Sequence, residues 1–462
     1  MDAMMRRIAL LAAVFLGGWM SASAQSTTDS LMLRTIFSEA LSNGECHENL
    51  RELCKDIGHR LSGSQQLDDA VTWGAKKLRG YRADSVWLQP VMVPKWTRGD
   101  REYASYRVNG TDYPLRISAL GGSVGSNGKI TAEVIEVKRI TDLEELPRSA
   151  VEGKIVLFNR PMDPLLINTG AAYGGAFDQR SDGASAAARH GAVGTLVRSL
   201  THALDTFPHT GAMDYADDVK PIPAAGISTV DAQALKDALK QHPKLTVTLE
   251  LACKAYDDVE QANVIAELRG SEFPDEYIVV GGHLDSWDIG EGAHDDGAGI
   301  VQSIEVLRIL KAIGYQPRHT IRVVLFVNEE NGNRGGEHYA AEAKRKGESH
   351  LAAIESDSGG FSPRGFSTEA DDAEYAVFAS WFDLFEPYNI HQARRGWSGV
   401  DIRPLKDGDV SLFGLSPDPQ RYFDYHHSAR DVWENVNKRE LELGAAAMTS
   451  LVYLIDQTRL GR

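Results

Sequence analysis

The sequence has 462 residues, of which 42% are hydrophobic and 25% are charged, a composition typical of folded globular proteins and not of disordered chains. Acidic residues outnumber basic ones by 65 to 49, and the resulting formal charge of −16 argues against a nucleic-acid partner, because the chain would repel phosphates. The three cysteines are too few for a disulfide scaffold or a cysteine-based structural zinc site.

The first 24 residues have the pattern of a secretory signal peptide. Two arginines precede an apolar segment over residues 8–20, and the small residues Ala22 and Ala24 mark a cleavage site. The apolar segment is shorter than the roughly 20 residues that a transmembrane helix needs. We therefore predict cleavage near Ala24, export to the periplasm or the exterior, and no stable insertion into a membrane.

The sequence leaves the state of the cysteines open. Cys46 and Cys54 lie eight residues apart in a segment with helical periodicity. On one helix this spacing corresponds to about 12 Å, which is too far for a disulfide. We expect separate buried thiols unless one of them pairs elsewhere, and the state of Cys253 is equally open.

The hydrophobic pattern divides the mature chain into a catalytic domain and an insert. Residues 30–80 predict helices, and residues 84–137 predict strands punctuated by Gly and Asn. Short strands and helices then alternate over residues 153–250, as in a small α/β module. The predicted divisions are a signal peptide (1–24), an N-terminal part of the catalytic domain (25–110), an insert (111–252) and the rest of the catalytic domain (253–462).

From about residue 260 the strands and helices become longer and alternate regularly. The segment before Gly314 carries Ile300, Ile304 and Leu307 at spacings of three and four, which predicts an amphipathic helix. Strands such as IRVVLFV are apolar throughout, as in parallel sheets buried on both faces. The predicted fold is therefore α/β, with a mostly parallel, mixed sheet that is flanked by helices on both faces.

Ionisable side chains follow several of these predicted strands. One such residue at one strand end is commonly a solvated turn or a helix cap, but here several occur together, and ligands bind beyond the carboxyl ends of parallel strands. Carboxylates crowded in one crevice repel each other unless cations neutralise them. The residues expected to converge are His283, Asp295, Glu329, Glu330 and Asp357, and far downstream the sequence carries the pair His426 and His427.

Mixed imidazole and carboxylate groups without thiols favour zinc or a similar divalent ion. The number of candidate ligands fits two ions better than one, and two such ions share a carboxylate and activate a water molecule between them. In the pair Glu329-Glu330, one carboxylate can bind metal while the other acts as a general base.

Four motifs in this region carry a family resemblance. GGHLDSWDIGEGAHDDGAGI, NEENGNRGG, ESDSGG and HHSARD resemble, in this order, the motifs of the co-catalytic di-zinc exopeptidases of the aminopeptidase Y and glutamate carboxypeptidase type. IGHRLSGS and the insert resemble the carboxypeptidase branch of that family, and the insert resembles a protease-associated domain. The resemblance spans nearly all of residues 30–460, and it implies a peptidase fold and the hydrolysis of dipeptides or short peptides.

The resemblance also implies a role for each site residue. One zinc would be held by His283, Asp295 and Asp357, and a second by Asp295, Glu330 and His427, so that Asp295 bridges the two ions. Glu329 would be the general base, and Asp285 would orient His283. In this family the peptide bond after the bridging aspartate is cis. The choice of His427 over His426 rests on matching HHS-x-x-D to the family's last motif.

Alternative functions stay open. An aminopeptidase of the same family and a catalytically inactive binding protein on a peptidase fold are the main ones, and a single-zinc cyclase is opposed by the second ligand set. A serine hydrolase would need a helix after GGSVG (121–125), where a strand is predicted.

A carboxypeptidase or dipeptidase needs a cation for the substrate's terminal carboxylate, and the candidates are Arg394, Arg395, Arg403, Lys406 and Arg421. The insert has two open roles, shaping substrate access or forming a homodimer contact.

Overall fold

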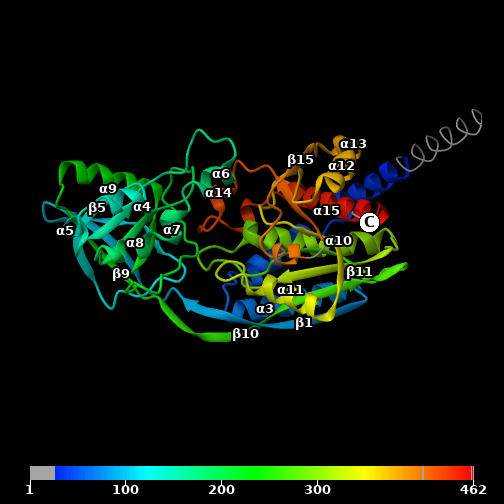
Figure 1. Ribbon diagram of the computed structural model, residues 1–462, viewed down its shortest axis with the longest axis horizontal. Helices are drawn as coiled ribbons and strands as arrows, with labels where there is room; N and C mark the ends of the chain where they lie inside the picture. The colour runs from blue at the N-terminus through cyan, green and yellow to red at the C-terminus, as the bar shows by residue number, and fades with distance from the viewer. Residues whose placement is uncertain (1–26, 408–409, 459, 461–462) are drawn as a thin grey trace, which may run out of the picture.

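The computed structural model describes residues 27–407, 410–458 and 460, so the predicted signal peptide lies outside the described residues. Two mixed sheets of eight strands each form the centres of two lobes that lie side by side (Figure 1). No helix in this described part of the chain is long and apolar enough to cross a bilayer.

The sheet of the larger lobe is parallel at its centre and mixed at its edges. Its strand order is β1-β10-β12-β11-β13-β16-β14-β15, and β12, β11, β13 and β16 run parallel. The prediction of a mostly parallel, mixed sheet is therefore confirmed. The strands are β1 (Ser85–Thr97), β10 (Lys254–Leu268), β11 (Phe273–His283), β12 (His319–Phe326), β13 (Ser349–Glu355), β14 (Pro363–Thr368), β15 (Gln392–Arg395) and β16 (Ser411–Pro417).

Helices cover both faces of this sheet, because side chains alternate between the faces along each strand. Ile278 and Val280 pack with apolar residues of α3, α10 and α15 on one face, while Val279 packs with Tyr339 of α11 on the other. The helices of this lobe comprise one over residues 27–43, α2 (Cys46–Arg51), η1 (Glu52–Ile57), α3 (Gln65–Gly80), η2 (Ala293–Gly297), α10 (Ala298–Ala312), α11 (Arg334–Lys346), α12 (Asp372–Ser380), α13 (Phe382–Phe385), η3 (Glu386–Tyr388), η4 (Arg403–Asp407), α14 (Tyr422–Tyr425), η5 (Trp433–Asn435) and α15 (Lys438–Thr458).

The predicted amphipathic helix before Gly314 is α10, but it is buried on every side. All residues from Ala298 to Leu310 are buried, polar ones included, because α10 lies between the sheet and the helices α2 and α15. Its buried charge is compensated locally, since Arg308 donates hydrogen bonds to Glu305 (2.8 Å) and to Glu39 (2.8 Å).

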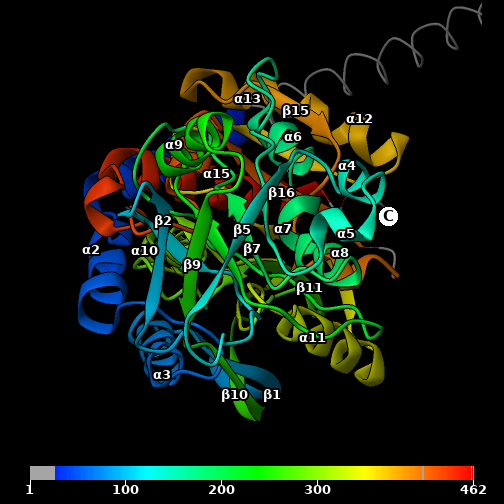
Figure 2. The ribbon, with the colours of Figure 1, turned by 90° about the vertical axis from the view of Figure 1, so that its left-hand side faces the viewer.

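The smaller lobe contains the second sheet, with the order β3-β2-β9-β5-β6-β7-β8-β4. The predicted insert lies within this lobe, to which β2 also belongs through its hairpin with β3. Figure 2 views this lobe from its own side. Its elements are β2 (Glu102–Val108), β3 (Thr111–Leu115), β4 (Ile117–Ala119), β5 (Ile130–Val137), α4 (Ile140–Glu144), α5 (Arg148–Val151), β6 (Ile155–Phe158), α6 (Thr169–Gly174), α7 (Asp178–Ser181), α8 (Gly183–Arg189), β7 (Gly194–Arg198), β8 (Ala224–Ile227), α9 (Thr229–Gln241) and β9 (Thr246–Leu251).

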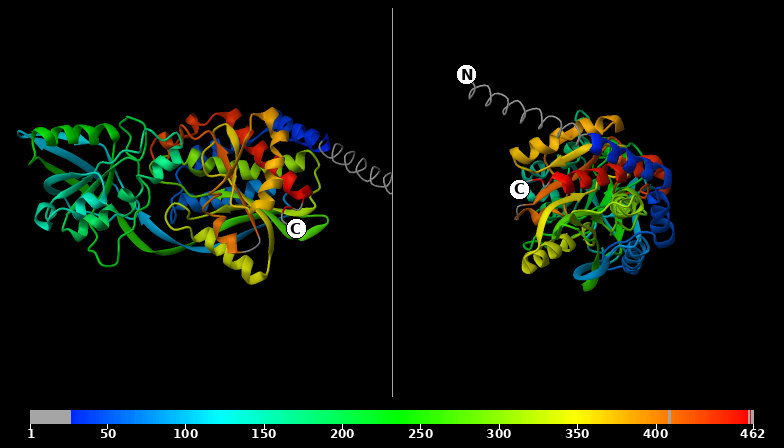
Figure 3. Two further views of the ribbon diagram at one scale, coloured as in Figure 1. Left: turned by 45° about the horizontal axis from the view of Figure 1, so that its top comes forward. Right: turned by 90° about the vertical axis from the view of Figure 1, so that its right-hand side faces the viewer.

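Both chain connections between the lobes run through one antiparallel pair of strands. β1 leaves the larger lobe and β10 returns to it, and the two pair from Ser85 opposite Glu267 as far as Thr97 opposite Lys254. The left panel of Figure 3 shows this pair below the gap between the lobes. The three cysteines of the chain are all buried and unpaired, so the expectation of separate thiols is confirmed for Cys46 and Cys54.

Candidate metal centre

The carboxyl ends of three parallel strands bring the predicted residues together. His283 is the last residue of β11, the pair Glu329-Glu330 follows β12, and Asp357 follows β13. Asp295 lies in η2, between β11 and α10, and the loop after α14 supplies His427. Because β11 lies between β12 and β13 in the sheet, these side chains meet at one edge of the larger lobe.

Asp295 lies between the two histidines. Its Oδ1 is 3.2 Å from His283 Nε2, and its Oδ2 is 3.2 Å from His427 Nε2. On the first side, His283 Nε2 is also 3.6 Å from Asp357 Oδ1. On the second side, His427 Nε2 is 3.0 Å from Glu330 Oε2. The predicted ligands therefore form two neighbouring sets that share Asp295. One set contains His283 and Asp357, and the other contains Glu330 and His427.

Several nitrogen and oxygen atoms that could bind a metal ion in this cluster have no hydrogen-bond partner among the described residues. They are His283 Nε2, Asp295 Oδ2, Glu330 Oε1 and Asp357 Oδ1, all buried. Burying a polar atom without a partner is costly, and a cation would satisfy all four. Nitrogen and oxygen donors without thiolates suit zinc. Three groups in the described chain have ligand atoms within 4.8 Å of one another: His283/Asp295/Glu330, His283/Asp296/Asp357 and Asp295/His426/His427.

Two of these groups include a neighbour of a predicted ligand. Asp296 uses both carboxylate oxygens in hydrogen bonds, because it accepts the backbone N–H groups of His283 (3.1 Å) and Gly299 (3.0 Å). His426 stacks on His427 with ring centroids 3.5 Å apart, and its Nε2 is 3.6 Å from Asp295 Oδ2. The peptide bond between Asp295 and Asp296 is cis, as the family resemblance implied.

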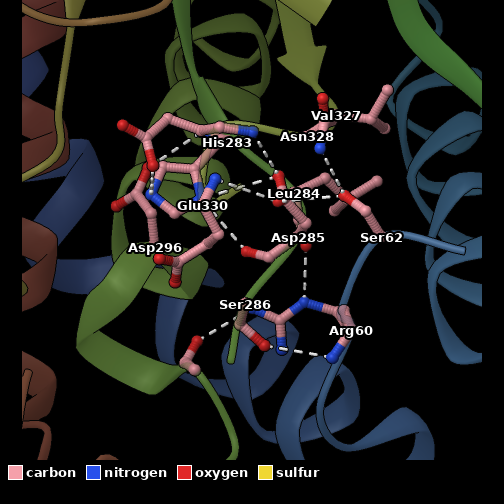
Figure 4. Close-up of polar contacts among 12 residues, drawn as sticks. Arg60, Ser62, His283, Leu284, Asp285, Ser286, Asp296, Val327, Asn328 and Glu330 are labelled. Carbon is pink, nitrogen blue, oxygen red and sulfur yellow. Dashed lines mark hydrogen bonds and ion pairs between the residues drawn. The ribbon is translucent and has the colours of Figure 1, made fainter. Parts of the chain in front are cut away.

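The ring of His283 is oriented by backbone. Its Nδ1 donates to the carbonyl oxygen of Asp285 at 3.1 Å, whereas the Asp285 carboxylate lies 3.8 Å away. That carboxylate instead accepts the backbone N–H groups of Glu329 (3.1 Å) and Glu330 (3.2 Å). Figure 4 shows Asp285 close to His283 and Glu330. Asp285 thus holds the two glutamates through its carboxylate and faces His283 with its carbonyl.

The ring of His427 is oriented by the smaller lobe, a contact that was not predicted from the sequence. Its Nδ1 lies 3.3 Å from the carbonyl oxygen of Thr210 and 3.3 Å from Nη1 of Arg180. An N–H at Nδ1 that donates to this carbonyl leaves the lone pair of Nε2 free for a cation. Thr210 is 217 residues from His427 in the chain, so no local pattern announces the contact.

Arg60, in the IGHRLSGS segment, also supports the metal centre, although the sequence did not predict a role for it. Its fully buried guanidinium donates to the carbonyl oxygens of Leu284 (2.7 Å), Glu291 (2.7 Å) and Gly292 (2.9 Å). These contacts fix the loop between β11 and η2 (Figure 4). The loop therefore has a defined path between the strand that ends in His283 and the turn that carries Asp295.

The electrostatics of the cluster show how strongly its charges interact. Burial raises the pKa of Glu330, and repulsion by Asp295 raises it further, to about 7 despite the nearby histidine. Burial alone would lower the pKa of His427, but the carboxylates of Glu330 and Asp295 outweigh burial and raise the pKa to about 9. Burial, followed by repulsion from Asp357, raises the pKa of Glu329 well above its ordinary value. Without a cation the cluster therefore retains protons that a bound metal would displace.

Glu329 and Asp357 lie on the open side of the cluster. Their side chains are 18% and 21% exposed, whereas that of Glu330 is 2% exposed, and Glu329 Oε2 is 4.0 Å from His283 Nε2. Asp357 also lines a cavity of about 250 Å³. Other residues that line this cavity are Arg394, Arg395, Trp397, Ser398 and Ser416.

The five candidate cations for a substrate carboxylate differ in their contacts. Arg395, Lys406 and Arg421 form ion pairs with Asp372, Glu369 and Glu440, respectively. Arg403 stacks on the ring of Trp397 at 4.3 Å. Arg394 lines the cavity beside Asp357 and forms no ion pair with any other described residue. It is the candidate best placed to receive a substrate carboxylate.

The GGSVG segment does not form a nucleophile elbow. It lies in the connection between the strands β4 and β5, so the element that follows it is a strand and not a helix. The hydroxyl of Ser123 accepts the backbone N–H of Ala224 at 2.9 Å and is buried. The structure therefore removes the serine-hydrolase alternative.

Comparisons with known proteins define the class of protein to which this fold and site belong. The model of peptidase family M28 matches residues 263–452, the segment that contains all of the predicted ligands. The chain is 33% identical to carboxypeptidase Q of Bos taurus over 92% of its own length and 88% of that protein. It is 34% identical to the human carboxypeptidase Q over 88% of its length and 84% of that protein. The chain belongs to peptidase family M28, which confirms the predicted family.

Solved structures agree with this assignment. A peptidase M28 precursor from Shewanella amazonensis superposes with a TM-score of 0.88 and 32% identity, covering 93% of this chain and 97% of that one. A zinc aminopeptidase from Bacillus subtilis has a TM-score of 0.63 and 21% identity, with 88% of this chain and 94% of that chain covered. The second likeness shows a shared fold alone.

Proposed function

We propose that this protein is a zinc exopeptidase that hydrolyses dipeptides or short peptides. One zinc would be held by His283, Asp295 and Asp357, and the other by Asp295, Glu330 and His427. The observation that carries the proposal is the convergence of buried donor atoms that have no hydrogen-bond partner in the described chain. The name of the relatives, carboxypeptidase Q, supports the class of reaction.

The residues around the proposed ions divide the chemistry between them. Zinc, when bound, polarises a carbonyl group and lowers the pKa of water, so that hydroxide is available near neutral pH. Glu329 is placed to take the proton from the attacking water, since its carboxylate is partly exposed beside His283. It then returns that proton to the amine that leaves. Glu330, which is deeper in the cluster, serves as a ligand.

Recognition of a terminal carboxylate favours a carboxypeptidase or dipeptidase over an aminopeptidase. Arg394 lines the cavity that shares Asp357 with the metal cluster, and its guanidinium forms no ion pair with another described residue. A guanidinium binds a carboxylate through two parallel hydrogen bonds. The carboxypeptidase Q relatives support the same choice. Export after cleavage near Ala24, a protease-associated type for the insert, and a homodimer contact are further proposals.

A substrate panel tests the proposed function on the zinc-loaded protein. Dipeptides with both ends free, with a blocked amine, or with an amidated carboxylate are compared, and zinc per chain is measured by elemental analysis. We expect about two zinc ions and cleavage only of peptides with a free carboxylate. Cleavage of amidated peptides with a free amine would instead establish an aminopeptidase. Stoichiometric zinc without turnover of any peptide would identify an inactive binding protein.

A further inference from the structure

The smaller lobe contacts both the backbone and the ring of the candidate ligand His427. The N–H of Thr210 donates to the carbonyl oxygen of His427 at 2.9 Å, and His209 pairs with Ser428 in an antiparallel bridge. The carbonyl of Thr210 faces Nδ1 of the His427 ring at 3.3 Å. A short segment of the smaller lobe thus pairs with the loop that carries the candidate ligand.

The next residue, Gly211, leaves no room for a side chain. Its φ of +132° is in the region that favours glycine, and a Cβ atom there would lie 2.6 Å from Nδ1 of His427 and still closer to Arg180. Arg180 cannot easily withdraw, because its guanidinium is buried over the rings of Tyr173 and Phe177. Close approach of the backbone to His427 therefore requires glycine at this position.

Gly121, from the GGSVG segment, extends the same surface. Its N–H donates to the carbonyl oxygen of Gly211 at 3.0 Å. A Cβ atom on Gly121 would overlap the indole of Trp287, and that indole lies edge-on to the His427 ring with centroids 5.8 Å apart. We call Gly121 and Gly211 the glycine seat. It receives Trp287 and His427, two side chains of the larger lobe.

We propose that the glycine seat makes the smaller lobe part of the metal centre, with Gly211 and Trp287 as positioning residues for His427. The seat fixes the ring so that Nδ1 donates to Thr210 and Nε2 faces Asp295 and Glu330. Groups that orient a ligand in this way typically change metal affinity roughly 10- to 100-fold when they are lost. The inference rests on the proposed function only in taking His427 as a ligand.

Zinc titration of the metal-stripped full-length protein tests the proposal directly. In Gly211→Ala, we expect one of the two zinc ions to bind roughly 10- to 100-fold more weakly, while the other keeps its affinity. Gly128→Ala is the matched control, because Gly128 is in the same lobe, has a φ of +107° and has nothing within 4 Å of an added Cβ. It should bind both ions as the wild type does. Equal zinc affinities in Gly211→Ala and the wild type would overturn the proposal.

Two further variants keep the outcome decisive. Trp287→Phe removes the part of the ring that contacts Gly121 without adding volume, and it should weaken the same zinc to a smaller extent. If Gly211→Ala does not fold, Trp287→Phe decides, and an unchanged zinc affinity then overturns the proposal. His427→Ala should lose that zinc altogether. If His427→Ala binds both ions normally, the proposed ligand set fails, which is distinguishable from a failure of the seat alone.

Discussion

At the scale of single residues, the two adjacent glutamates illustrate how environment separates similar groups. Glu330 is held deep in the cluster beside His427, whereas Glu329 reaches the open side. Both backbone N–H groups bind the carboxylate of Asp285, so the two side chains start from a fixed turn. In the proposed site, position alone therefore distinguishes the candidate ligand Glu330 from the candidate proton acceptor Glu329.

Replacing Glu329 by Gln tests this division. The amide cannot accept a proton, so we expect kcat on a dipeptide to fall by about 10² to 10⁴-fold, while zinc content and thermal stability stay close to those of the wild type. His283→Ala is the comparison variant, and elemental analysis should show that it loses metal. Near-normal turnover by Glu329→Gln would show that another group accepts the proton.

Arg394→Ala should affect substrates with a free carboxylate selectively. Loss of the charged hydrogen bonds should raise KM for such a dipeptide by roughly 10-fold. The inhibition constant of an amidated analogue, which the proposed carboxypeptidase does not cleave, should stay unchanged. Arg395→Ala is the matched control, because Arg395 lines the same cavity but pairs with Asp372. If the inhibition constant of the amidated analogue rose as much as KM for the free dipeptide, Arg394 would not be the group that binds the carboxylate.

At the scale of elements, strand ends were predictable and contacts between distant segments were not. His283, Glu329 and Asp357 each follow an apolar run in the sequence, and the parallel sheet then places them together. The burial of α10 on all sides was not predicted, because polar residues such as Arg308 suggest a solvent-exposed face. Only the fold shows that Arg308 pairs with Glu39. The contact between Thr210 and His427 was not predicted either, because the two residues are distant in the sequence and lie in different lobes.

The end of α15 provides a prediction about stability at this scale. Asp456 accepts hydrogen bonds from the backbone N–H (2.8 Å) and Nδ1 (2.9 Å) of His319, at the start of β12, and from the Tyr315 hydroxyl (2.5 Å). We expect Asp456→Asn to lower the free energy of unfolding by about 2–3 kcal/mol at pH 7, measured by urea denaturation. An unchanged denaturation midpoint would contradict this role.

The same variant has an expected pH dependence. Burial opposes ionisation of Asp456, but the hydrogen bonds from His319 and Tyr315 outweigh it and lower the pKa below the ordinary aspartate value. A carboxylate with a lowered pKa contributes stability that is present at neutral pH and is lost as pH falls through that pKa. The difference between wild type and Asp456→Asn should therefore be largest near pH 7 and shrink in acid. A constant difference across this range would indicate a purely steric effect.

At the scale of the whole molecule, the proposed metal centre draws its ligands from segments between His283 and His427, and the smaller lobe supports one of them. Removing zinc should therefore lower the stability of the whole fold. With free zinc at about 100 times Kd, each ion adds about 2.7 kcal/mol. We expect a chelator to lower the Tm and added zinc to restore it, measured by calorimetry. An identical Tm with and without chelator would argue against resident ions.

The pair of strands that joins the lobes has a mechanical consequence. β1 and β10 form the covalent connection in both directions, so a tilt of one lobe against the other pivots about this ladder. Such a tilt would carry Thr210 and Gly211 away from His427. Any movement that separated the lobes would thus also release the proposed metal ligand His427, and peptide entry from that side would be coupled to the assembly of the proposed metal centre.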